Sequence, residues 1–140
     1  MARFFKAVGA LLVTFLIFFG VPVFSYSSFQ KIFKMVPPAR LNDAAIYQLA
    51  SLKGLEAFIL VILYLLIIDR RRGKEGRYAI FVSLLLFIQA GVIPELWFYI
   101  TLSTPELYTA AGIVSSFVSY GLSGWFLSKF YKTSASVILP

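Results

Sequence analysis

The sequence predicts an all-α integral membrane protein: a four-transmembrane-helix bundle with a short outer interfacial amphipathic helix. Its composition indicates a membrane protein, because 60% of its 140 residues are hydrophobic, 14% are charged and the mean hydropathy is +0.87. Soluble domains are roughly half apolar and about a quarter charged. The chain also contains four apolar stretches that each approach the length of about 20 residues needed to cross the hydrocarbon. Together these observations predict a single four-helix transmembrane domain across residues 1–140.

Short polar or proline-containing segments separate the four predicted spans. We expect the spans at residues 7–24, 44–68, 78–99 and 107–130. A secretory signal peptide is the alternative for the first of them, because Arg3 and Lys6 precede it and a possible cleavage site ends at Ser25. Its apolar stretch exceeds the usual signal-peptide core of about 7–15 residues, which favours a helix that is retained.

The basic residues predict which side of the membrane each connection faces. If the N-terminus is cytoplasmic, nine Lys and Arg residues lie on the cytoplasmic side and four on the outer side. Cytoplasmic connections of membrane proteins carry the excess of Lys and Arg, so we expect both termini in the cytoplasm. The cytoplasmic set comprises Arg3, Lys6, Arg70, Arg71, Arg72, Lys74, Arg77, Lys129 and Lys132, and the outer set comprises Lys31, Lys34, Arg40 and Lys53.

The connection after the first span has the pattern of a short amphipathic helix over residues 28–36. Ser27 or Ser28 can cap its start, and Pro37 and Pro38 end it. The pattern predicts a helix that lies in the plane of the outer interface, separate from the first span. Its apolar face comprises Phe29, Ile32, Phe33 and Val36, and its polar face comprises Gln30, Lys31 and Lys34.

Two charged residues stand in the second span, just before its twelve-residue apolar run at 57–68. Lys53 and Glu56 are three residues apart, so they lie on one helix face and can pair. At about 1.5 Å per residue from the inner end of that run, they lie roughly 22 and 18 Å into a core of about 30 Å, in its outer half. The same rise per residue, counted from Tyr78 at the inner end of the third span, places Gln89 and Glu95 at depths of roughly 17 and 26 Å.

These four side chains are candidates for an outer-leaflet polar pocket that accepts a ligand or an ion. Tyr64, further along the second span, is a fifth candidate. Pro94 supports this hypothesis, because it removes a backbone hydrogen bond beside Glu95 and favours a kink there. The alternative is structural: Lys53 extends toward the interface, and Glu56 neutralises it within a helix contact. The pocket candidates are Lys53, Glu56, Gln89, Glu95 and Tyr64.

The fourth span carries a face of small residues at four-residue spacing. Small side chains let two helix backbones approach closely, and serine hydroxyls can form hydrogen bonds across such a contact. The face can pack against another helix of this chain, or it can dock a second subunit. Its members are Ala111, Gly112, Ser115, Ser116, Ser119, Ser123 and Gly124.

The segment between the second and third spans is strongly basic. We expect it to face the cytoplasm and to contact anionic lipid headgroups, each basic group contributing on the order of 1 kcal/mol near the surface. It lacks the glycine and lysine spacing of a phosphate-binding loop, and the net charge of +7 is better explained by membrane topology than by nucleic-acid binding. The residues concerned are Arg70, Arg71, Arg72, Lys74 and Arg77.

The composition also limits the function. The chain has neither cysteine nor histidine and only six acidic residues, so thiol nucleophiles, Ser-His-Asp triads and Cys- or His-ligated metals are excluded. We therefore expect no enzymatic activity, no cofactor and no metal. The expected function is a non-catalytic accessory subunit of a larger membrane complex, bound to partner subunits or to copies of itself. The alternative is a small binding or transport protein for a lipid, quinone or other amphiphile.

Overall fold

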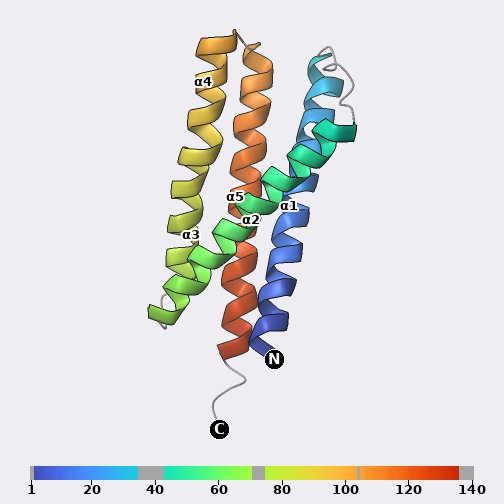
Figure 1. Cartoon of the computed structure of the whole chain (residues 1–140). Helices are drawn as coiled ribbons and strands as arrows, with labels where there is room; N and C mark the ends of the chain where they lie inside the picture. Colours follow the sequence, from blue (N-terminus) through green and yellow to red (C-terminus); the bar gives the residue numbers. More distant parts are fainter. Residues whose placement is uncertain (1, 35–42, 71–74, 104, 136–140) are drawn as a thin grey trace.

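A computed structural model describes residues 2–34, 43–70, 75–103 and 105–135 of the chain. Within these residues the elements are α1 (Ala2–Phe33), α2 (Asp43–Arg70), α3 (Glu75–Leu86), the π-helical segment η1 (Phe87–Val92), α4 (Ile93–Leu102) and α5 (Glu106–Ala135). No strand occurs in this described part of the chain. The segments α3, η1 and α4 follow one another without a break and form one long helical run (Figure 1).

Four of these helical runs are long and apolar enough to cross a membrane. They cover Phe4–Phe33, Tyr47–Leu66, Arg77–Leu102 and Glu106–Tyr131. Most of their large apolar side chains point outward, as expected where the surrounding solvent is hydrocarbon. The all-helical architecture with four membrane-length helices is therefore confirmed.

Helix α5 is the centre of the bundle. It contacts α1 on one side and α3, η1 and α4 on the other, while α2 crosses diagonally over the group and contacts α1 and α3 (Figure 1). The core contains Phe18 of α1, Leu60 and Tyr64 of α2, and Tyr120 and Leu127 of α5. The start of α1 and the end of α5 lie at the same end of the bundle, as an even number of crossings requires (Figure 1).

The structure shows no separate amphipathic helix after the first span, because α1 continues unbroken to Phe33. Ser27 and Ser28 lie inside α1 and do not cap a new helix, and Pro22 does not interrupt it either. A helix of 32 residues is roughly 48 Å long, which exceeds a hydrocarbon core of about 30 Å. The positive φ of Lys34, 50°, follows the end of the helix, and Val36 lies outside the described residues.

The third helical run contains a widened turn just before Pro94. In η1 the backbone N–H of Ile93 donates to the carbonyl oxygen of Ile88, five residues back instead of four. Proline has no N–H to donate, and in a regular α-helix its ring clashes with the carbonyl four residues earlier. A π-helical turn at this place accommodates Pro94 without ending the helix. The irregularity predicted at Pro94 is therefore present, in the form of a π-helical turn.

The basic segment between α2 and α3 falls mostly outside the described residues. Arg71, Arg72 and Lys74 are among the residues that the structure does not describe, and for Arg70 only the backbone is described. Arg77 is exposed at the beginning of the third run. Contacts of this segment with anionic headgroups stay a prediction.

Candidate functional site

Lys53 and Glu56 form the ion pair that their spacing predicts. The ammonium Nζ of Lys53 donates to both Oε1 and Oε2 of Glu56 at 3.0 Å. The two side chains are 23% and 27% exposed, so the pair is partly buried. Both residues belong to α2, and the pair by itself therefore joins no two helices.

Glu95 of α4 extends this pair to a second helix. Lys53 lies close enough for its positive charge to act on the Glu95 carboxyl group. That carboxyl group rests against Gly112 of α5, where a Cβ atom would fall 2.7 Å from Oε2 of Glu95. A glycine at position 112 thus leaves the space that the carboxyl group occupies. The predicted Lys53–Glu56 pair is present, and an outer-leaflet pocket that also includes Glu95 stays a prediction.

Two tyrosines that the sequence did not single out complete this group. Tyr26 of α1 lies within electrostatic reach of Glu95, and Tyr120 of α5 lies within reach of Glu56. Tyr120 is 4% exposed, and its ring meets Phe18 of α1 edge-to-face at a centroid distance of 4.7 Å. We call Lys53, Glu56, Glu95, Tyr26 and Tyr120 the charged cluster, and its members come from α1, α2, α4 and α5.

The structure does not bring the other two pocket candidates into the charged cluster. Gln89 is exposed on the π-helical turn. Tyr64 is 1% exposed in the core, where its ring lies 5.6 Å from the ring of Tyr131, close to the end of α5. Gln89 is therefore on the surface of the bundle, and Tyr64 belongs to its core.

The small-residue face of α5 is covered by other helices of this chain. Ala111, Ser115, Ser119 and Ser123 are at most 3% exposed, and Gly112 and Gly124 are also buried. Ser115 donates to the carbonyl oxygen of Gly112 at 3.0 Å and Ser119 to that of Ser115 at 2.8 Å. These two hydroxyls therefore bond within α5 and not across the contact. The burial of these six residues supports the alternative of packing within the chain, whereas Ser116 is only partly buried.

Glycines set the distance between α5 and the third helical run. A Cβ atom at Gly91 of η1 would lie 2.7 Å from Cβ of Ser116 on α5. A Cβ atom at Gly124 would lie 2.9 Å from Cβ of Ser83 and 3.4 Å from the carbonyl oxygen of Ala79, both on α3. With Gly112 against Glu95, three glycine contacts hold these helices together along their length. The glycine at 91 was not predicted to take part.

Comparisons with protein-family models, with curated proteins and with solved structures found no significant match to this chain. The class of the protein therefore follows from its own features. Four candidate membrane-spanning helices and a charged cluster between them indicate a small multi-pass membrane protein.

Proposed function

We propose that this chain is a membrane protein that binds or transports an amphiphile, whose polar head is held at the charged cluster. The observation that supports the proposal is the Lys53–Glu56 ion pair on α2 together with the Glu95 carboxyl group, which rests against Gly112 of α5 inside the bundle. Charges inside a membrane are costly to place, and they commonly mark a binding site or a transport path.

The charges of the cluster indicate the kind of head group. The cluster has one ammonium group, on Lys53, and two carboxyl groups, on Glu56 and Glu95, and the hydrogen bonds of the ammonium are to Glu56. Glu95 is therefore the acidic group whose charge is less completely balanced. A cationic or hydrogen-bond-donating head, such as an amine or a hydroxyl group, complements such a carboxylate.

The proposal predicts that Glu95→Gln reduces the amphiphile that the protein retains. The variant and the wild type are purified in mild detergent, and native mass spectrometry measures the amphiphile that each retains. We expect at least fivefold less in the variant, because the loss of about 1 kcal/mol of binding free energy corresponds to about that ratio. Glu106→Gln is the matched control, because Glu106 is exposed at the start of α5 and bonds to Tyr99. Equal retention in both variants would contradict the proposal.

An accessory subunit of a larger complex remains the competing hypothesis. In the sequence it is supported by the small size of the chain, the absence of cofactor ligands and the small-residue face of α5 as a docking surface. Because most residues of that face are buried among helices of this chain, the face gives less support to a partner. We therefore place amphiphile binding first.

We also propose that both ends of the chain face the cytoplasm and that the end of α1 near Phe33 faces outward. The chain has no cysteine, so single introduced cysteines can report on the orientation. Lys34, Arg77 and Glu106 are all exposed ends of helical runs. In intact cells a membrane-impermeant maleimide should label Lys34→Cys and Glu106→Cys, and it should label Arg77→Cys only after permeabilisation. The reverse pattern would invert the proposed orientation.

A further inference from the structure

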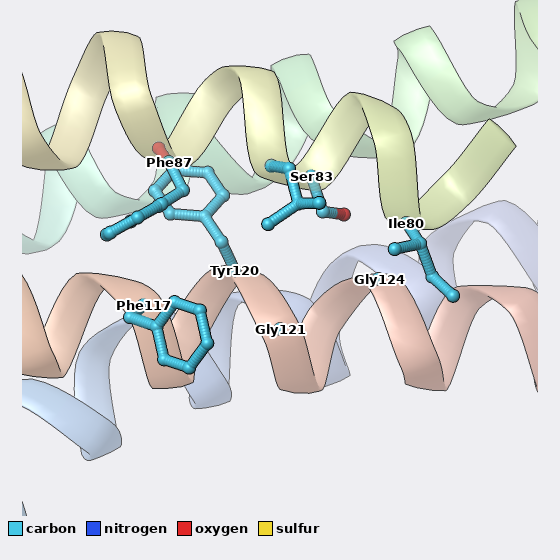
Figure 2. Close-up of a pocket in the computed structure, with 8 residues that line it drawn as sticks. Ile80, Ser83, Phe87, Phe117, Tyr120, Gly121 and Gly124 are labelled. Carbon is cyan, nitrogen blue, oxygen red and sulfur yellow. The ribbon is translucent and has the colours of Figure 1, made fainter. Parts of the chain in front are cut away.

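A cavity lies between α3 and α5, and no acidic residue is in its lining. It has a volume of about 190 Å³. Its lining comprises Ile80, Ser83, Leu84, Phe87, Phe117, Tyr120, Gly121 and Gly124 (Figure 2). Gly121 of α5 leaves the space open, since it has no atom within 4 Å of where its Cβ would stand, whereas Gly124 is in close contact with Ser83.

The lining of this cavity is apolar except for two hydroxyl groups. Ser83 is 3% exposed, and its Oγ has no hydrogen-bond partner. Figure 2 shows its side chain directed from α3 toward Gly124 of α5. A buried hydroxyl without a partner is unfavourable by about 1–3 kcal/mol, so a bound group that pairs with it is stabilised. The second hydroxyl in the lining belongs to Tyr120.

Water is a poor occupant for such a space. A buried water normally makes two to four hydrogen bonds, and apolar cavities of this kind stay dry. An apolar cavity of roughly 150 Å³ is large enough to bind benzene, so this one accepts a single substituted ring. Its aromatic wall suits a ring as well, because Phe87 and Phe117 lie edge-to-face with centroids 5.4 Å apart.

We propose that the α3/α5 cavity binds a neutral ring that carries a carbonyl group, as quinones do, with Ser83 donating a hydrogen bond to that carbonyl. A neutral ligand fits because no charged residue lines the cavity. Access is lateral from the membrane, since Ile80, Leu84 and Phe117 are each exposed by 46% or more. This site does not depend on the head-group proposal above, although Tyr120 belongs to both regions.

The test compares two rings of similar size, of which one carries carbonyl groups. Duroquinone and durene share a six-membered carbon ring with four methyl groups, but duroquinone is quinonoid with two carbonyls, whereas durene is aromatic and has none. Their affinities follow from the rise in melting temperature of the protein in lipid nanodiscs at increasing ring concentration. We expect wild type to bind duroquinone about fivefold more tightly than durene, the ratio for one net hydrogen bond. Ser83→Ala should remove that preference and leave durene binding unchanged.

Two glycine variants provide the matched controls. Gly121→Leu fills the cavity and should abolish the response to both rings. Gly20→Leu makes the same change at another glycine with open space around it, on α1 and outside the lining, and should keep both responses. Equal responses of Gly121→Leu and Gly20→Leu would place the rings elsewhere and overturn the site. Equal affinities of wild type for duroquinone and durene would overturn the role of Ser83.

Discussion

Gly124→Leu is expected to destabilise the bundle by about 3 kcal/mol or more, the upper range for a residue forced into a packed contact. Gly124 is buried, and a Cβ atom there would lie 2.9 Å from Cβ of Ser83 and 3.4 Å from the carbonyl oxygen of Ala79. Neither of these atoms is the end of a flexible side chain, so α3 and α5 must separate to admit leucine. Unfolding by denaturing detergent, followed by circular dichroism, measures the change in free energy.

Gly121→Leu is the matched control for this experiment, three residues earlier on the same helix. Position 121 is exposed and open, and leucine has a helix propensity superior to that of glycine by up to about 1 kcal/mol. We therefore expect Gly121→Leu to be neutral or slightly stabilising. If Gly124→Leu unfolds at the same detergent fraction as Gly121→Leu, then α3 and α5 do not approach each other as closely as the structure describes.

The four membrane-length helices could be predicted because length and hydrophobicity are properties of local sequence. The continuation of α1 through Ser27 and Ser28 could not, because serine is favoured at a cap yet also tolerated within a helix. Continuing the helix keeps the backbone groups of residues 25–30 paired, which a break at the membrane surface would expose. The π-helical turn likewise depends on Pro94 together with the approach of Gly91 to Ser116, a contact between distant parts of the sequence.

The charged cluster was predicted in part for the same reason. The Lys53–Glu56 pair follows from a three-residue spacing, and Glu95 follows from its depth along the third run. Depth along a helix, however, gives no direction around it. Gln89, at a similar depth, is exposed on the π-helical turn, and its part in a pocket stays a prediction. Tyr26 and Tyr120 were missed because their proximity depends on which helices are neighbours in the bundle.

Lys53→Leu is expected to lower the free energy of unfolding by about 2–4 kcal/mol, somewhat less than for a fully buried pair, since both side chains keep some exposure. It removes the ammonium group that pairs with Glu56 and whose positive charge acts on Glu95. Glu56→Leu should have a smaller effect, about 1–2 kcal/mol, because Lys53 still balances Glu95. Lys31→Leu, at an exposed basic residue of α1, should change the stability by less than about 0.5 kcal/mol.

The double variant Lys53→Leu/Glu56→Leu distinguishes paired charges from independent ones. If each charge is tolerated because of the other, the double variant should be less destabilised than the sum of the two single variants, by at least about 1 kcal/mol. A coupling energy near zero would show that Lys53 and Glu56, although 3.0 Å apart, do not stabilise each other. The double variant also tests function: it should fold and yet retain less amphiphile than wild type if the pair helps to bind a head group. Wild-type retention by a stable double variant would mean that Lys53 and Glu56 serve the packing of the bundle alone, and would leave Glu95 as the acidic group on which any head-group site depends.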